Sequence, residues 1–316
     1  MQERFKKDES SVRVLLTGSS GLVGSDLLGL LQRRKFQVIH PSSAEVDLLN
    51  QGSVNEMLER IKPDVVIHCA GKVGGIQANI NNQLQFCLDN MLMGINLIRS
   101  SLECDVPNFV NLGSSCMYPT NALNPLSESD ILSGPLEPTN EGYGVAKVAV
   151  AQLAEYCDES TRGTYKTIIP CNLFGENDDF DPKTSHMIPG VIKKLYDAKE
   201  QEAPQCDIWG DGEARREFMY VGNLSDFIVS HLDGLETLPK KINVGMGEDF
   251  SINEYYQIIA KVVGYNGSFF HDLQRPSGMR QKLVDTKQQE ALGWKPPISL
   301  LEGIERTYKA FLASKI

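Results

Sequence analysis

The chain has 316 residues, of which 41% are hydrophobic and 23% charged, as is typical of a globular protein with a sizeable buried core. Its net charge of -10 argues against a general nucleic-acid surface, because phosphate contacts need clustered Lys and Arg. Apolar runs fall short of the roughly 20 residues that span a bilayer. The opening "MQERFKKDESS" lacks the apolar core of a secretion signal, so we expect a cytoplasmic protein that binds neither membrane nor nucleic acid.

The chain contains seven cysteines, an odd number with no CxxC pair. This pattern suits neither a disulfide framework nor a zinc site, so we predict reduced, mostly buried thiols and no metal. The cysteines stand at positions 69, 87, 104, 116, 157, 171 and 206.

Runs rich in Val, Ile and Leu alternate with helical patterns along the first half of the chain. The runs occupy residues 12–18, 36–40, 64–71, 108–115 and 166–175. Strands that alternate with helices predict an α/β fold with a doubly wound parallel sheet. Continuous rather than alternating hydrophobicity is typical of strands that are buried on both sides.

Two helices are expected to carry unusually apolar surfaces. In the first, apolar residues follow helical spacing from Leu84 to Leu102, and the second, "YGVAKVAVAQLAEY", is apolar on nearly every side. Such a helix buries one face on the sheet and another elsewhere. We therefore expect a homodimer through helices at about 82–103 and 143–158; burial under a second domain is the alternative.

The pattern changes after Gly175, where a loop rich in Asp and Asn precedes a helix. Later segments return to the earlier rhythm, with a strand at "KINVGMG" and helices that Ser251 and Ser299 open. We predict a main domain of residues 11–175 with returning segments at about 215–250. The remaining segments, 176–214 and 251–316, are predicted to form a smaller, interleaved C-terminal substrate-binding lobe.

The first strand leads into "TGSSGLVGSDLL", where Gly18, Gly21 and Gly24 have the spacing GxxGxxG before a helix. Such glycines allow a tight turn and a close approach to a pyrophosphate, whose charge the amides at the helix N-terminus meet. The position of the motif after the first strand predicts a dinucleotide-binding Rossmann sheet.

The end of the second strand bears on the choice between NAD and NADP. NAD sites place a carboxylate there, whereas this strand ends in His40, Pro41, Ser42 and Ser43. The hydroxyls of Ser42 and Ser43 can donate to a 2'-phosphate, which favours NADP(H). Asp47 either reaches the adenine or caps the next helix.

The segment "EGYGVAK" places Tyr143 and Lys147 four residues apart on one face of a helix. A free tyrosine has a pKa of about 10, and a nearby ammonium favours its phenolate. We therefore expect Lys147 to lower the pKa of Tyr143, so that the pair exchanges a proton with a carbonyl or alkoxide oxygen.

The glycine turn, the serine-bearing strand end at 112–115 and the Tyr–Lys pair resemble the extended short-chain dehydrogenase/reductase family in order and separation. The resemblance implies that Ser114 bonds the reacting oxygen, Tyr143 donates a proton, and Lys147 holds the nicotinamide ribose. The expected cofactor-binding residues are Gly18, Ser20, Gly21, Leu22, Val23, Gly24, Ser42, Ser43, Asp47, Ala70, Lys147 and Asn172.

More specific strings, "CAGKVGGIQAN", "NLGSSCMYP", "NLFGENDDFDPKTSHMIPG" and "WGDGEARREFMYV", are similar to those of the GDP-fucose synthase family. This resemblance implies NADPH-dependent conversion of GDP-4-keto-6-deoxy-D-mannose to GDP-L-fucose, by epimerisation at carbons 3 and 5 and hydride reduction at carbon 4. It also implies that Cys116 and His186 are the base and acid of the epimerisation. The alternative is a 4-reductase or 4-epimerase acting on another GDP-sugar, such as a heptose.

The chemistry supports such a pair independently of the family. A 4-keto group acidifies the protons on carbons 3 and 5, so a base can remove one and an acid can return it on the opposite face. A thiol is a useful base only when nearby positive charge lowers its pKa from about 8.5 toward neutrality. A histidine, with a pKa of about 6.5, can deliver a proton near neutral pH. We expect His68 to be only a hydrogen-bonded strand residue.

Cations and aromatic rings are expected around the GDP moiety. Lys194 departs from the family pattern, which has an arginine at that position, and "GSSG" departs in the glycine turn. The expected substrate-binding residues are Asn172, His186, Lys194, Trp209, Arg216 and Lys282. A non-catalytic NADP-binding regulator with the same fold is the alternative from another class of function; retention of the Tyr–Lys pair argues against it.

Overall fold

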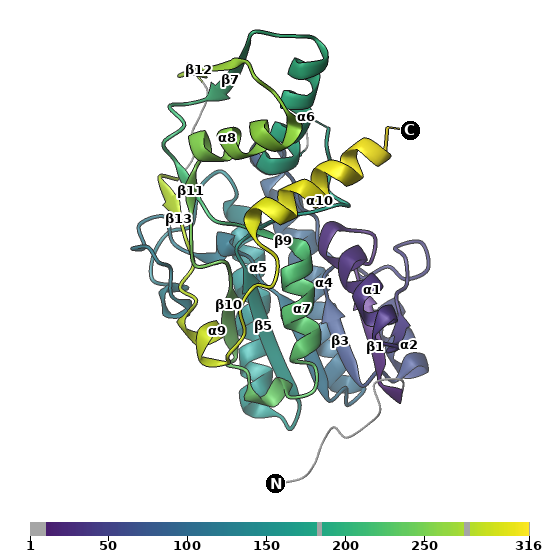
Figure 1. Ribbon diagram of the computed structural model, residues 1–316. Helices are drawn as coiled ribbons and strands as arrows, with labels where there is room; N and C mark the ends of the chain where they lie inside the picture. The colour runs from purple at the N-terminus through teal and green to yellow at the C-terminus, as the bar shows by residue number, and fades with distance from the viewer. Residues whose placement is uncertain (1–10, 182–184, 275–278, 316) are drawn as a thin grey trace.

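The computed structural model describes residues 11–181, 185–274 and 279–315, and its centre is a six-stranded parallel sheet (Figure 1). In spatial order the strands are β10 (Lys241–Val244), β5 (Thr164–Pro170), β4 (Asn108–Leu112), β3 (Val65–His68), β1 (Arg13–Thr17) and β2 (Gln37–Ile39). The chain crosses from one side of β1 to the other after β2. Ligands bind at such a reversal, beyond the carboxyl ends of the strands.

Helices cover both faces of this sheet, which confirms the predicted doubly wound α/β class (Figure 1). Alternate side chains of β1 divide between the two layers: Val14 and Leu16 join the core with α1 and α7, and Leu15 joins the core with α2 and α4. The helices of these layers are α1 (Leu22–Arg33), α2 (Gln51–Ile61), α3 (Ile76–Asn81), α4 (Gln83–Glu103), α5 (Glu141–Ser160) and α7 (Val221–Ser230).

A smaller lobe stands beyond the carboxyl ends of the strands, at the top of Figure 1. It has its own core, in which Ile192, Tyr255 and Ile304 are buried. The elements outside the main sheet and its helices are β6 (Asn172–Phe174), α6 (Met187–Glu200), β7 (Gln205–Trp209), β8 (Arg215–Arg216), β9 (Phe218–Tyr220), β11 (Phe250–Ser251), α8 (Ile252–Val263), β12 (Ser268–Asp272), β13 (Gln281–Lys282), α9 (Lys287–Ala291) and α10 (Leu300–Ala313). Short 3-10 turns lie at Ser115–Met117, Glu128–Asp130 and Leu235–Thr237.

The strand predicted over 166–175 is two strands. β5 ends at Pro170, and β6 begins at Asn172 and leaves the main sheet to pair with β9. Composition could not reveal this break, because the apolar side chains on both sides of it are buried. The break places Asn172 beside β9, where its amide donates to the carbonyl oxygen of Glu217 at 2.8 Å.

Two predicted helix starts are confirmed, and one of the two alternatives for Asp47 is excluded. Ser251 caps α8 by accepting from the N–H of Glu254, and Ser299 caps α10 in the same way. Asp47 does not cap α2. Asn50 does so, and the carboxylate of Asp47 accepts instead from the N–H of Leu49 at 2.9 Å.

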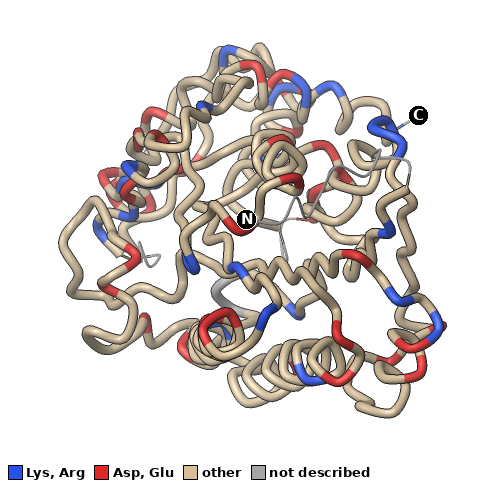
Figure 2. The backbone as a smooth tube through the Cα atoms, turned by 90° about the horizontal axis from the view of Figure 1, so that it is seen from below, with Lys and Arg blue, Asp and Glu red and all other residues tan. Residues whose placement is uncertain are grey.

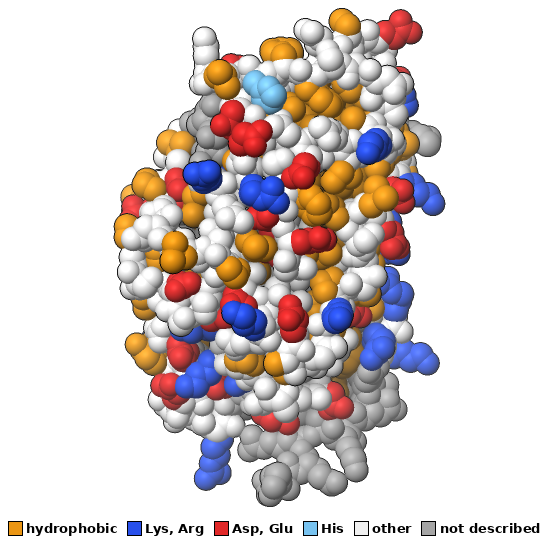
Figure 3. Space-filling view, turned by 60° about the vertical axis from the view of Figure 1, so that its left-hand side comes forward, with side chains coloured by type: hydrophobic (Ala, Val, Ile, Leu, Met, Phe, Trp, Pro, Cys, Tyr) orange, Lys and Arg blue, Asp and Glu red, His pale blue; other side chains and the backbone are white. Residues whose placement is uncertain are grey.

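The surface carries charges of both signs. Figure 2 shows Lys and Arg interspersed with Asp and Glu around the molecule, and the face in Figure 3 has the same mixture. Among the helices of the described residues, none is long and apolar enough to cross a membrane.

Candidate active site

The glycine turn fits tightly against the end of β3. Gly18 has φ +72°, and a Cβ there would come within 2.5 Å of the backbone nitrogen of Ala70, so a larger residue cannot fit. Gly21 is the N-cap residue of α1 and offers no side chain to the first-turn amides. These amides are the groups that receive a pyrophosphate at a helix N-terminus. The residues present therefore fit a dinucleotide.

The end of β2 contains a carboxylate that the sequence analysis overlooked. Both the N–H and the hydroxyl of Ser42 donate to Glu45 at 2.8 Å. These bonds lower the pKa of Glu45, so a negative charge lies beside the serine proposed to bind a 2'-phosphate. The expectation that this strand end lacks a carboxylate is therefore wrong, because the turn after it brings Glu45 back.

The end of β3 contributes two buried titratable groups. Burial lowers the pKa of His68 to about 3, and its Nδ1 lies 3.0 Å from the hydroxyl of Thr17. This confirms that His68 is a hydrogen-bonded strand residue. Burial also raises the pKa of Cys69 to about 12, although Lys147 acts in the opposite direction. Cys69 therefore stays a neutral thiol at physiological pH.

Ser114, Tyr143 and Lys147 come together from β4 and α5. Ser114 follows β4 and is hydrogen bonded to the Tyr143 side chain. The Lys147 ammonium lies 5.7 Å from the centroid of the Tyr143 ring and donates to the carbonyl oxygen of Leu112 at 2.8 Å. Lys147 is 7% exposed, so this carbonyl bond helps to offset the cost of burying its charge.

The expected lowering of the pKa of Tyr143 is wrong for the protein alone. Burial raises this pKa, and charge on Cys116 raises it further, while the bond with Ser114 acts in the opposite direction. Burial also lowers the pKa of Lys147 to about 8. Both side chains are buried, and burial disfavours the charged form of each: the phenolate of Tyr143 and the ammonium of Lys147. Tyr143 is therefore protonated at neutral pH, as a proton donor must be.

Cys116 lies in the 3-10 turn after Ser114, where its N–H donates to the Ser114 hydroxyl at 3.2 Å. Its sulfur receives two donors, Asn140 Nδ2 at 3.2 Å and the ammonium of Lys282 at 3.6 Å. A Cβ on Gly144 would come within 2.7 Å of the Cys116 carbonyl oxygen. Only glycine lets the start of α5 approach so closely, which brings Cys116 beside the Tyr–Lys pair.

His186 is paired with a carboxylate that the sequence analysis did not single out. Its Nδ1 lies 3.4 Å from Oδ1 of Asp178, whose side chain is 3% exposed. The hydrogen bond with Asp178 raises the pKa of His186, with a smaller contribution from Asp179. His186 therefore stays protonated to higher pH than an isolated histidine. Its pairing with Cys116 across a bound sugar stays a prediction.

The proposed nucleotide-binding residues differ in how they are engaged. Lys194 forms an ion pair with Asp207 at 2.8 Å, so its charge is already partnered within the lobe. Trp209, at the end of β7, is hydrogen bonded to Asp207, and its side chain is 51% exposed. Burial lowers the pKa of Arg216, and its Nη1 donates to the neighbouring carbonyl of Arg215.

Sequence reasoning missed three supporting residues. Asn140 lies one helical turn before Tyr143, a spacing that could have drawn attention to it. Asp178 is one of several carboxylates in its loop, and nothing in the sequence distinguishes it. Glu217 follows Arg215 and Arg216 directly and precedes an apolar run, so the sequence does not distinguish it from the exposed charges around it.

Glu217 is fully buried and connects three segments. Its carboxylate accepts from the N–H groups of Met246, Gly247 and Val284 at 2.6, 2.9 and 2.9 Å. Burial nevertheless raises its pKa to about 7. Glu217 thus joins the loop after β10 to the segment that follows Lys282.

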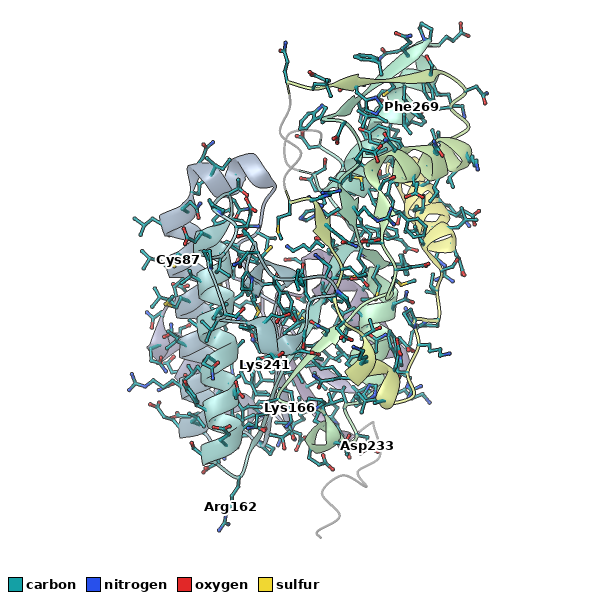
Figure 4. The ribbon with its side chains drawn as sticks, turned by 90° about the vertical axis from the view of Figure 1, so that its left-hand side faces the viewer. Cys87, Arg162, Lys166, Asp233, Lys241 and Phe269 are labelled. Carbon is teal, nitrogen blue, oxygen red and sulfur yellow. The ribbon has the colours of Figure 1, made fainter. Side chains whose placement is uncertain are left out.

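A surface hollow at the opposite edge of the sheet is a weaker candidate. It is lined by Lys166 and Lys241, near the amino ends of β5 and β10, which Figure 4 shows far from Phe269 of the lobe. Its lysines are partnered: Lys166 with Asp158 at 3.0 Å and Lys241 with Glu155 at 2.6 Å. We therefore place the active site at the carboxyl ends of the strands.

Comparison with known proteins agrees with this placement. The model of the NAD dependent epimerase/dehydratase family matches residues 14–245. A GDP-L-colitose synthase from Yersinia pseudotuberculosis is 47% identical, covering 96% of this chain and 99% of that protein. A GDP-L-fucose synthase from Azorhizobium caulinodans is 44% identical, with coverages of 95% and 96%. The solved structure of a GDP-mannoheptose C4 reductase from Campylobacter jejuni with NADP bound has a TM-score of 0.89 at 28% identity, with coverages of 96% and 99%.

The parallel sheet, the glycine turn and the Ser–Tyr–Lys cluster define an enzyme of the extended short-chain dehydrogenase/reductase class. Within that class, the chain belongs to the NAD dependent epimerase/dehydratase family.

Proposed function

We propose that this enzyme converts GDP-4-keto-6-deoxy-D-mannose to GDP-L-fucose with NADPH, by epimerisation at carbons 3 and 5 and then reduction at carbon 4. The observation that carries the proposal is the position of Cys116. Its sulfur, beside the ammonium of Lys282, lies two residues along the chain from the serine that is bonded to Tyr143. A base for carbon acids and a donor for the reduced oxygen thus share one segment.

Epimerisation requires a proton to leave one face of the sugar and another to arrive on the opposite face. Cys116 removes the proton that the 4-keto group acidifies. His186 returns a proton, and Asp178 raises its pKa so that it stays protonated to higher pH. Solvent then takes the proton from Cys116 and returns one to His186, and the same two residues act at the second of carbons 3 and 5.

Reduction uses the buried end of the site. The nicotinamide cofactor, when bound, supplies the hydride for carbon 4. Tyr143, which burial keeps protonated, gives its proton to the developing alkoxide, and Ser114 bonds the same oxygen. Lys147 stabilises the tyrosinate that remains and orients the cofactor ribose.

NADP(H) is the cofactor of this proposal, supported by the hydroxyls of Ser42 and Ser43 and by the NADP bound to the similar heptose reductase. Glu45 works against a 2'-phosphate, because its carboxylate lies beside Ser42. Glu45→Gln should therefore lower the KM for NADPH about threefold and leave the KM for NADH within twofold. An equal effect on both cofactors would remove the charge argument.

The decisive experiment is turnover in deuterated water. GDP-4-keto-6-deoxy-D-mannose, NADPH and the enzyme should give GDP-L-fucose with solvent deuterium at carbons 3 and 5. NMR of the product checks both positions. Retention of hydrogen at both carbons, with NADPH consumed, would show a simple 4-reductase and overturn the epimerase part.

A second candidate is suggested by the 47% identity to a GDP-L-colitose synthase. Colitose is 3-deoxyfucose, so its 4-keto precursor has no hydroxyl-bearing centre at carbon 3 to invert. The same pocket would then invert carbon 5 alone. Competition between the two 4-keto sugars, with kcat/KM for each, decides between the candidates.

We also propose that α4 and α5 form the interface of a homodimer in the cytoplasm. Leu84, Leu88 and Leu92 of α4 and Val145 and Tyr156 of α5 are 40–73% exposed, so the lobe does not cover them. Figure 4 shows Cys87 at the outer side of α4, facing away from the lobe. An apolar helix pair of this kind fits a second copy, and the seven free thiols fit a reducing compartment. Leu88→Arg should give monomers in sedimentation, whereas Leu301→Arg on α10 should not.

The division of the chain stays part of the proposal. Residues 11–175 with about 215–250 bind the dinucleotide, and residues 176–214 with 251–316 form the lobe that receives the GDP-sugar. The lobe then supplies His186, Trp209 and Lys282 to the substrate.

A further inference from the structure

The sulfur of Cys116 is contacted from two distant parts of the chain. Asn140 donates from the residue before α5, and Lys282 donates from β13, 166 positions after the cysteine. The carboxamide oxygen of Asn140 is buried and has no protein partner among the described residues. The amide group is therefore turned so that its N–H, rather than its oxygen, serves the sulfur.

Two donors on one sulfur favour a thiolate over a thiol as their acceptor. A neutral thiol is a weak acceptor, whereas a thiolate accepts strongly and is stabilised by a neighbouring cation. The charged and titratable groups that act on this sulfur are Lys282 from β13 and Lys147 and Tyr143 from α5. Of these, only the Lys282 ammonium contacts the sulfur itself through a hydrogen bond.

The strand that carries Lys282 is held firmly in place. β13 pairs with β8, with Lys282 opposite Arg216. Two residues on, the N–H of Val284 donates to the buried carboxylate of Glu217 at 2.9 Å, and the N–H of Leu283 donates to Asn124 at 2.8 Å. The ammonium therefore extends from a fixed backbone, which is what preorganised electrostatic stabilisation requires.

We infer that Lys282 is a positioning residue for the base: its ammonium holds Cys116 as the thiolate that removes the sugar protons. The inference rests on the proposed function for its catalytic meaning, but the charge on the sulfur does not depend on any substrate. It also differs from the expectation that Lys282 binds the substrate diphosphate. The two roles predict different measurements.

The test follows the alkylation of Cys116 by iodoacetamide in the full-length enzyme between pH 5.5 and 9.5. Mass spectrometry of the peptide that contains Cys116 gives the rate, and the peptide of partly exposed Cys104 is an internal reference. Lys282→Met should slow alkylation of Cys116 about tenfold at pH 7 and move the rise of its rate to higher pH. Lys282→Arg should restore most of the rate. Lys287→Met, which removes an exposed ammonium five residues away, should match wild type.

Two results would overturn the inference. One is an alkylation profile for Lys282→Met that matches wild type in an enzyme that still binds NADPH. The other is a raised KM for the GDP-sugar with unchanged alkylation, which assigns Lys282 to the diphosphate. If Lys282→Met binds no NADPH, the comparison of Lys282→Arg with Lys282→Gln replaces it.

Failure of the proposed function has a different signature. If the wild type turns over no GDP-4-keto sugar but Lys282→Met shows the shifted alkylation profile, the role of Lys282 is supported and the proposed reaction is contradicted. If the wild type incorporates solvent deuterium at carbons 3 and 5 but Lys282→Met shows no alkylation shift, the proposed reaction is supported and the role of Lys282 is contradicted.

Discussion

The two ends of the site are built differently. At the hydride end, Ser114, Tyr143 and Lys147 belong to one sheet and one helix, and burial sets their protonation. At the proposed proton-transfer end, a charged side chain lies beside each of the two residues: the ammonium of Lys282 beside Cys116, and the carboxylate of Asp178 beside His186. Desolvation keeps Tyr143 protonated and lowers the pKa of Lys147 at the first end, whereas a neighbouring carboxylate raises the pKa of His186 at the second.

The largest effect should follow from Tyr143→Phe. Removing the proton donor should lower reduction at carbon 4 by roughly 10³-fold, because the alkoxide then has no acid. Solvent deuterium should still enter carbons 3 and 5, since the proton-transfer end is intact. Loss of deuterium exchange to the same extent would mean that the two ends are not independent. Tyr308→Phe on α10 is the matched control.

Cys116→Ser should have the next largest effect, and this effect should fall on proton transfer at carbons 3 and 5 rather than on hydride transfer. A serine hydroxyl is a far weaker base than a thiolate, so deuterium exchange should fall roughly 10²-fold. NADPH affinity, measured by fluorescence titration, should stay within twofold. Cys104→Ser should leave both quantities unchanged, and normal exchange in Cys116→Ser would assign the base to another residue.

Asp178→Asn should change exchange about tenfold and alter its pH dependence. Asp178 raises the pKa of His186, so in the wild type the protonated acid persists to higher pH. Without the carboxylate of Asp178, the pKa of His186 should be lower. As pH is increased, deuterium exchange in the variant should therefore begin to fall at a lower pH than in the wild type. Asp179 contributes in the same direction more weakly, so Asp179→Asn should give a smaller shift of the same sign. A shift to higher pH in either variant would contradict the pairing.

Glu217→Gln should have the smallest effect on turnover and act on stability instead. The raised pKa, about 7 in the fold against an ordinary 4.5, means that the native state binds more protons than the unfolded state between these values. Protonation of Glu217 therefore adds about 3 kcal/mol to the free energy of unfolding below about pH 4.5. This stabilisation is lost as the pH rises toward 7. Urea titrations at pH 4.5 and 7.5 should therefore show a smaller pH difference in Glu217→Gln than in wild type. Exposed Glu248→Gln should resemble wild type.

Much of the fold could be predicted because its signals are local. Each buried parallel strand is a continuous apolar run, and Ser251 and Ser299 mark helix starts by their own side chains. The break at Cys171 could not be predicted, because apolar residues stand on both sides of it and the change lies in the pairing partners of β5 and β6.

The candidate site divides in the same way. Tyr143 and Lys147 are one helical turn apart, so their proximity follows from spacing. The contact between Lys282 and Cys116 depends on the pairing of β13 with β8, which no local pattern encodes. The raised pKa of Tyr143 also lies beyond sequence spacing, since it depends on the depth of burial.

The bond from the N–H of Cys116 to the hydroxyl of Ser114 has a consequence for how such enzymes can diverge. This bond holds both the 3-10 turn and the Ser114 side chain in place, and it uses the backbone N–H of Cys116 rather than its thiol. A substitution at position 116 can therefore delete one chemistry and leave the scaffold of the other unchanged. The single substitution Cys116→Ser would then separate an epimerising reductase from a plain one.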